Sequence, residues 1–237
     1  MSNNPLIIAM DVDTIEEAGR LADVLRPHVG AFKVGMQLFN SEGPAVIRFL
    51  KEKNVPVFID LKLHDIPNTV AAAAKALTGH GVSIINIHAA GGRAMMQAAA
   101  AAVREEAERL NLIRPLLVAV TVLTSIDQEV FNSQIGIPGT IADRVTAWAA
   151  MAQEAGLDGV VASPREIVAI RAACGKEFVI ITPGVRPAGA AMNDQKRVMT
   201  PAEAVRQGAT YLVIGRPITE APDPALAAWE ILESMHN

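Results

Sequence analysis

Two lysines and two aspartates in the first 62 residues have the types and spacing to form one charged cluster. Asp60 and Lys62 lie two residues apart at the end of an apolar run, so on a β-strand their side chains would leave the same face. Asp11 follows the first apolar run, and Lys33 lies in the second. An ammonium group held among carboxylates keeps its charge, and it can stabilise a developing negative charge or donate a proton. We therefore predict a site for electrostatic and acid–base chemistry.

A structural ion-pair network and a metal site are the alternatives for this cluster. Candidate metal ligands are Asp11, Asp60, Asp65, His64 and His88. Lys33 and Lys62, however, occupy positions where a cation would sit, and an ammonium group neutralises carboxylates without a metal. We therefore expect no metal ion. The full set of charged residues favours a functional site over a structural network.

Two late segments of the chain have the composition of a phosphate site. Gly184 and Arg186 follow one apolar run, and Gly215 and Arg216 follow the next. Glycine lets backbone N–H groups approach an anion, and arginine offers a planar set of donors. Residues 183–195, which end at Gln195, carry prolines and glycines and are expected to form a mobile lid. These segments predict a phosphorylated substrate.

Eight short apolar runs, rich in valine and isoleucine, must position these residues. They span residues 6–10, 31–34, 55–59, 82–87, 116–120, 157–161, 178–181 and 211–214. Their nearly continuous hydrophobicity is typical of strands buried on both faces of a parallel sheet. Helical stretches separate the runs. Thr14 is expected to cap the first helix, and Asn68-Thr69 leads into an alanine-rich helix that ends near Thr78.

Eight β/α units in this length predict an α/β fold, a single (β/α)8 TIM barrel that occupies residues 1–237 as one domain. The carboxyl ends of all barrel strands meet at one mouth, where phosphate often binds after strands seven and eight. The same mouth would receive Thr124 and Ser125, which follow the fifth run. An open doubly wound sheet is the alternative, but no long insertion marks a switch point between its halves.

The composition restricts the class of protein and its location. The chain is 51% hydrophobic with a formal net charge of −4, which provides a large core and argues against a nucleic-acid-binding protein. Its single cysteine, Cys174, excludes an intramolecular disulfide and suits a reducing compartment. No basic signal-peptide region and no bilayer-length apolar run is present. We expect a cytoplasmic protein without a membrane partner.

The segment Asp60-x-Lys62-x-x-Asp65-Ile66-Pro67-Asn68-Thr69 resembles the signature of the orotidine 5′-phosphate decarboxylase family. Asp11, Lys33, the segment 183–186 and Gly215-Arg216 also match the family in order and spacing, so the resemblance covers essentially the whole chain. It implies decarboxylation of orotidine 5′-phosphate to uridine 5′-phosphate, the last step of de novo pyrimidine nucleotide synthesis. It further implies a homodimer that works without a cofactor.

The resemblance implies that the charged cluster performs the chemistry. Lys62 would donate a proton to C6 of the pyrimidine after carbon dioxide leaves, and Asp60 would lie beside the departing carboxylate. Lys33 and Asp11 would contact the ribose and complete an alternating network of charges. Decarboxylation leaves a carbanion, which a nearby ammonium group can stabilise and then protonate.

The remaining matching residues are implied to bind the substrate or to complete the partner subunit's site. Thr124 and Ser125 would face the base. Asp65 and Thr69 would reach the site of the partner subunit. The phosphate and the closing loop would be held by Arg186, Gln195, Gly215 and Arg216.

Three other activities fit parts of the pattern. A sugar-phosphate decarboxylase or aldolase resembling the same barrel group shares Asp-x-Lys-x-x-Asp, but it carries an acidic residue on strand two and uses magnesium. A metal-dependent pentose-phosphate epimerase would need His and Asp ligands where Lys33 and Lys62 stand. The third is a catalytically silent protein that binds a phosphorylated ligand. The complete charged cluster disfavours all three.

Overall fold

Eight parallel strands close into a barrel in the computed structural model, which describes residues 4–186 and 199–236. The strands are β1 (Leu6–Met10), β2 (Ala31–Gly35), β3 (Val57–Leu63), β4 (Ile84–His88), β5 (Leu116–Val120), β6 (Gly159–Val161), β7 (Val179–Pro183) and β8 (Tyr211–Ile214). Each strand pairs with its neighbours in sequence order, and β8 pairs with β1 to complete the ring. The predicted TIM barrel is confirmed, and the open doubly wound sheet is wrong.

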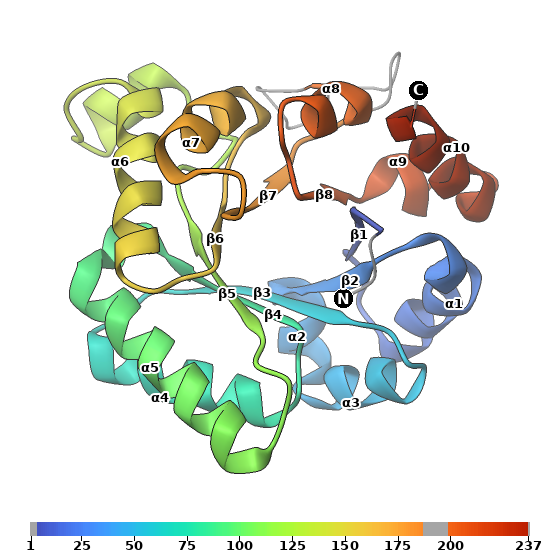
Figure 1. Cartoon of the computed structure of the whole chain (residues 1–237). Helices are drawn as coiled ribbons and strands as arrows, with labels where there is room; N and C mark the ends of the chain where they lie inside the picture. The colour runs from blue at the N-terminus through green and yellow to red at the C-terminus, as the bar shows by residue number, and fades with distance from the viewer. Residues whose placement is uncertain (1–3, 187–198, 237) are drawn as a thin grey trace.

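Helices follow the strands and form the outer layer around the barrel (Figure 1). They are α1 (Ile15–Leu25), α2 (Met36–Glu42), α3 (Ala45–Glu52), α4 (Pro67–Gly79), α5 (Gly92–Leu110), α6 (Ile141–Glu154), α7 (Ile167–Cys174), α8 (Pro201–Arg206), α9 (Arg216–Thr219) and α10 (Pro224–His236). No helix in the described part of the chain combines the length and the hydropathy needed to cross a membrane.

The helix starts follow from the residues that occupy them. Thr14 caps α1 as predicted: its hydroxyl accepts a hydrogen bond from the Glu17 N–H, and the Glu17 carboxylate accepts one from the Thr14 N–H. Helix α4 begins at Pro67, one residue before the predicted lead-in. Proline is well suited to the first helical position because the N–H that it lacks would have no partner there.

Two apolar clusters hold the barrel together. Inside it, Ile7, Phe58 and Val213 pack with other inward-facing side chains. On the other face of the strands, Ile8 and Ile59 belong to a second, larger cluster that includes the buried faces of the helices. Because both faces of each strand are buried, the strands must be apolar along nearly their whole length, as the sequence runs are. Polar groups are therefore concentrated at the strand ends.

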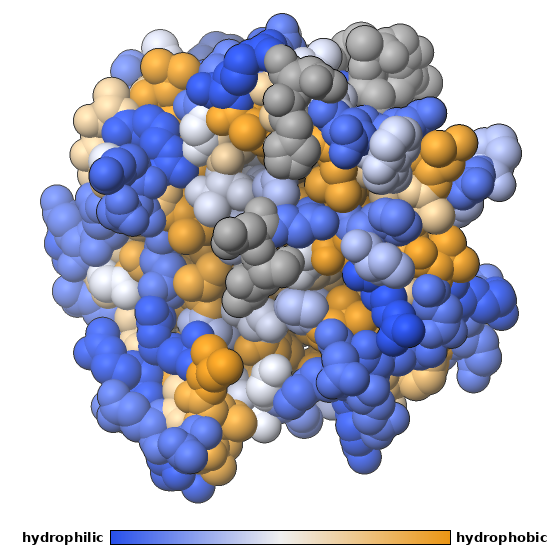
Figure 2. Space-filling view, turned by 45° about the vertical axis from the view of Figure 1, so that its right-hand side comes forward, coloured by the Kyte–Doolittle hydropathy of each residue, from blue (hydrophilic) through white to orange (hydrophobic). Residues whose placement is uncertain are grey.

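The surface shown in Figure 2 is mostly hydrophilic, with apolar side chains gathered in patches between the polar ones. Exposed apolar residues include Met36 at 52% and Ile66 at 67% exposure, which follow the carboxyl ends of β2 and β3. Leu123, which follows β5, is also exposed. Apolar side chains therefore reach the surface at the end of the barrel where catalytic groups are expected.

Candidate active site

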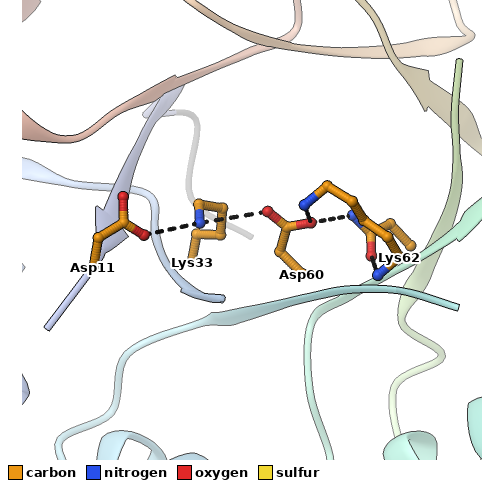
Figure 3. Close-up of polar contacts among 5 residues, drawn as sticks. Asp11, Lys33, Asp60 and Lys62 are labelled. Atoms are coloured by element: carbon orange, nitrogen blue, oxygen red, sulfur yellow. Dashed lines mark hydrogen bonds and ion pairs between the residues drawn. The ribbon is translucent and has the colours of Figure 1, made fainter. Parts of the chain in front are cut away.

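Four charged side chains, one directly after β1 and three on β2 and β3, lie in a row at the carboxyl-terminal mouth of the barrel (Figure 3). Lys33 Nζ lies 3.4 Å from Asp11 Oδ1 and 3.4 Å from Asp60 Oδ2. Lys62 Nζ lies 2.7 Å from Asp60 Oδ1. Carboxylates and ammonium groups therefore alternate along the row. The structure brings together all four residues of the cluster described above.

Asp60 contacts both ammonium groups and is largely buried. Its side chain is 12% exposed, whereas that of Asp11 at the outer end of the row is 58% exposed. Burial alone would raise the pKa of Asp60, but the charges of Lys33 and Lys62 and hydrogen bonds from Lys62 and Asn86 outweigh it and lower the pKa below its usual value. Asp60 is therefore ionised at neutral pH.

The backbone of β3 is irregular where it presents these groups. Its pairing with β4 shifts register between Ile59 and Leu63, and Lys62 has a φ of 52°. This left-handed conformation costs a residue with a side chain roughly 1–2 kcal/mol. The expectation of a regular strand is therefore corrected: β3 continues to Leu63, and Asp60 and Lys62 meet across a bulge. Bulges re-aim side chains and are common beside active sites.

Asn86 of β4 contacts two β3 residues within the register shift, Asp60 and Lys62. Its side-chain oxygen accepts a hydrogen bond from the Lys62 N–H at 2.8 Å, and its Nδ2 donates to Asp60 Oδ1 at 2.6 Å. The side chain is almost completely buried. The sequence pattern marks Asn86 only as a polar residue near a strand end, because its contacts depend on the register between β3 and β4.

A cavity of about 230 Å³ opens beside Lys33, Asp60 and Lys62. Side chains of the barrel interior, among them Phe58, form an apolar part of its wall. Thr124 and Ser125, in the turn after β5, add polar groups to the lining. The cavity therefore combines a charged side with an apolar wall, which suits a flat ring that carries a charged substituent.

The segment after β7 lies at the same end of the barrel, but it does not line this cavity within the described residues. Gly184 follows β7 directly and has a φ of 77°, a conformation that favours glycine. The guanidinium group of Arg186 is buried, and one of its N–H groups donates to the carbonyl of Val185. Gln195, predicted to hold the closing loop, lies outside the described residues.

The segment after β8 lies against the charged row. A Cβ atom added at Gly215 would lie 3.7 Å from Asp11 Oδ2, so the backbone of this loop passes close to Asp11. Arg216 is exposed and begins α9. The backbone of Gly215 is thus near the row, although neither residue lines the cavity described above.

Asp65 and Thr69 are not brought to the charged row of their own chain. Asp65 lies in the turn between β3 and α4, where its carboxylate accepts a hydrogen bond from the Ile66 N–H at 2.6 Å. Thr69 lies in the first turn of α4. Both side chains belong to exposed residues, and neither lines the cavity within the described chain.

Two histidines lie near the charged row and were considered as metal ligands. The ring centroids of His64 and His88 are 5.3 Å apart. Burial lowers the pKa of His88, and the charges of His64 and Lys62 lower it further, so His88 is neutral at pH 7. Within residues 4–186 and 199–236, no group of three or more His, Cys, Asp or Glu side chains is arranged to hold a metal ion.

A second cavity, of about 530 Å³, lies at the opposite end of the barrel. Pro56, Ser83 and Pro115, which precede β3, β4 and β5, belong to its lining. In TIM barrels the amino-terminal face contributes to stability, and catalysis takes place at the carboxyl-terminal face. The smaller cavity beside Asp60 is therefore the candidate active site.

Comparison with known proteins shows the family of the chain. A family model described as "Orotidine 5′-phosphate decarboxylase / HUMPS family" matches residues 4–231. Two relatives named orotidine 5′-phosphate decarboxylase come from Moorella thermoacetica (60% identity over 96% of this chain and 90% of the relative) and Syntrophomonas wolfei (54% over 98% of each). The crystal structure of orotidine 5′-phosphate decarboxylase from Lactobacillus acidophilus has a TM-score of 0.87 and 36% identity, covering 99% of this chain and 100% of that chain. The chain therefore belongs to the orotidine 5′-phosphate decarboxylase / HUMPS family.

Proposed function

We propose that this chain decarboxylates orotidine 5′-phosphate to uridine 5′-phosphate, the last step of de novo pyrimidine nucleotide synthesis. The observation that carries the proposal is the alternating row of Asp11, Lys33, Asp60 and Lys62 beside the cavity. The names of relatives at 54% and 60% identity support the same activity. We further propose that residues 1–237 form one catalytic domain. The cytoplasmic location of the protein stays a prediction from the sequence.

In the proposed reaction, Lys62 supplies both a positive charge and a proton. The bond between C6 of the pyrimidine and the carboxylate carbon breaks, and its electron pair stays on C6. The Lys62 ammonium group, at the edge of the cavity, stabilises that pair and then donates the proton that forms the new C–H bond. Asp60 orients the Lys62 ammonium group from 2.7 Å away and lies beside the departing carboxylate.

The other residues of the proposed site hold the rest of the nucleotide. Lys33 and Asp11 contact the ribose, and Thr124 and Ser125 face the base. The phosphate and the closing loop are assigned to Arg186, Gln195, Gly215 and Arg216. Binding energy from the phosphate can drive closure of the loop, so it contributes to the rate as well as to affinity.

Release of carbon dioxide from orotidine 5′-phosphate after exhaustive dialysis against a chelator tests this function. We expect full activity, because Lys33 Nζ lies 3.4 Å from a carboxylate oxygen of both Asp11 and Asp60 and takes the place of a cation between them. The same preparation assayed with magnesium and sugar phosphates provides the comparison. Activity that is lost on dialysis and restored by magnesium would favour the sugar-phosphate alternative.

Replacing Arg186 by alanine should lower kcat/KM by roughly 10- to 150-fold, the equivalent of one charge-assisted hydrogen bond of about 1.5–3 kcal/mol. Steady-state kinetics on the nucleotide measure the loss, and urea unfolding monitors the stability of the variant because Arg186 is buried. Arg48→Ala, which removes an exposed arginine from α3, is the matched control. The phosphate assignment is wrong if the phosphate-free nucleoside reacts as well as the nucleotide.

We further propose that the active unit is a homodimer in which Asp65 and Thr69 reach the partner subunit's site. Both residues are exposed and lie beyond the end of β3, so they can project away from their own barrel. The exposed apolar side chains of Met36, Ile66 and Leu123 lie at the same end of the barrel. Covering them in an interface would remove apolar surface from water, which favours association.

A further inference from the structure

We infer that Asn86 is a positioning residue that holds Asp60 and Lys62 in their reactive arrangement. Its side-chain oxygen accepts from the Lys62 N–H at 2.8 Å, and its Nδ2 donates to Asp60 Oδ1 at 2.6 Å. One side chain on β4 thus ties the backbone of Lys62 to the carboxylate of Asp60. The inference rests on the proposed function, since it assigns Asn86 a part in the same chemistry.

The surroundings of Asn86 select one orientation of its amide. The Lys62 N–H can only donate, and the ionised carboxylate of Asp60 can only accept. Exchanging the amide oxygen and nitrogen would therefore place two donors together and two acceptors together. Asn86 is only 1% exposed, so water does not replace either hydrogen bond. A residue that lacks the acceptor leaves the Lys62 N–H unsatisfied, and one that lacks the donor removes one of the two hydrogen bonds to Asp60 Oδ1.

The two hydrogen bonds act on the two features that aim the catalytic groups. The bond to the Lys62 N–H holds the residue whose φ is 52°, at the point where β3 changes its register with β4. The bond to Asp60 Oδ1 shares that oxygen with Lys62 Nζ at 2.7 Å, while Oδ2 faces Lys33. Asn86 therefore fixes both the backbone conformation of Lys62 and the rotation of the Asp60 carboxylate.

Asn86 does not line the active-site cavity within the described chain, so its removal should affect the reaction more than substrate binding. Asn86→Leu keeps a similar size and removes both hydrogen bonds. Because misplacement of reacting groups by about 1 Å can cost roughly 100-fold, we expect kcat to fall by about that factor with little change in KM. Urea unfolding of the variant separates this loss from loss of the fold.

Thr182→Val is the matched control. Thr182 is fully buried in β7, and its hydroxyl has no hydrogen-bond partner among the described residues. The change thus removes a buried oxygen from a barrel strand without breaking a hydrogen bond. We expect kcat and KM close to those of the wild type. A kcat loss in Thr182→Val as large as that in Asn86→Leu would show that any polar-to-apolar change in the barrel has this effect.

Asn86→Asp gives a signature that a purely structural role would not produce. A protonated carboxyl group at this position can still donate to Asp60 and accept from the Lys62 N–H, whereas an ionised one repels Asp60. Burial and the neighbouring Asp60 both raise the pKa of the introduced group. Relative to the wild type, kcat of this variant should therefore be highest at acidic pH and fall as the pH rises.

The charged and titratable groups around position 86 are Asp60 and Lys62 on β3, Lys33 on β2, His88 on β4 and His64 beyond β3. Val118, the residue opposite Asn86 on β5, adds none. The five groups are also present in the wild type, so the ratio of the two pH profiles isolates the introduced carboxyl group. A ratio that does not change with pH would contradict the inference.

Activity and positioning can be tested separately. If the wild type releases carbon dioxide and Asn86→Leu retains nearly the same kcat, the inference about Asn86 is wrong and the proposed function stands. If the wild type is inactive on orotidine 5′-phosphate, the proposed function fails. NMR titration of the Asp60 carboxyl group still decides the role of Asn86 in that case. Loss of the Asn86 hydrogen bond should raise the pKa of Asp60 in Asn86→Leu, and an unchanged pKa would overturn the inference.

Discussion

Lys62→Ala should abolish measurable decarboxylation while the barrel stays folded. The change removes the proposed proton donor, which is worth roughly 10²–10⁴-fold in rate, together with a positive charge beside C6. Stabilisation of developing charge typically adds another factor of about 10²–10³. The Lys62 side chain is 27% exposed at the edge of the cavity and contributes little to the core, so thermal unfolding should remain cooperative. Carbon dioxide release and an unfolding curve, measured on the same preparation, check both expectations.

Two further lysine variants make this result specific. Lys62→Arg should also fail, because a guanidinium group is a poor acid and does not replace a compact ammonium group. Lys75→Ala makes the same charge change on α4, where Lys75 is 54% exposed and 3.7 Å from Glu106, and it should retain activity. If Lys62→Ala decarboxylates at nearly the wild-type rate, Lys62 is not the proton donor.

Mixing inactive Lys62→Ala chains with inactive Asp65→Ala chains should restore activity once the subunits exchange. In the proposed dimer, each site combines Lys62 of one chain with Asp65 of the partner subunit. One site of a mixed dimer therefore contains both defects, and the other contains neither. Recovery should approach one working site per mixed dimer. The measurement is carbon dioxide release as a function of time after mixing.

The mixing experiment needs proof that the subunits exchange. Two differently tagged chains, separated by affinity, report the fraction of mixed dimers. A mixture of Lys62→Ala chains that differ only in their tags is the matched control and should stay inactive. Proven exchange without recovery would remove Asp65 from the partner subunit's site. It would leave the role proposed for Lys62 intact.

The barrel could be predicted from the sequence because its strands are buried on both faces. Seven of the eight strands agree with the apolar runs to within two residues at both ends. The exception is β3, which was expected to end near Ile59 but extends to Leu63. A search for apolar runs misses the end of a strand where polar residues such as Asp60 and Lys62 occupy it. The left-handed backbone conformation of Lys62 could not be predicted from residue type, because the position is not a glycine.

The charged row could be predicted because it needs only residue type and the rule that parallel strands end at one mouth. The contacts of Asn86 could not, because they depend on a register shift between β3 and β4. The burial of Arg186 could not be predicted either, since arginine is exposed in most proteins. Whether Asp65 and Thr69 serve the partner subunit is a property of two chains, and it stays a prediction.

Closure of the ring by β1 and β8 has a consequence for the synthesis of the chain. While β8 is still within the ribosome, β1 and β7 each present an open strand edge, with backbone groups free to pair with another chain. The residues of the charged row are made first, but the glycine loop that passes Asp11 is added only after β8. A nascent chain thus stays prone to aggregation until its last strand emerges. Protection of the edges and completion of the proposed substrate site then occur in the same step.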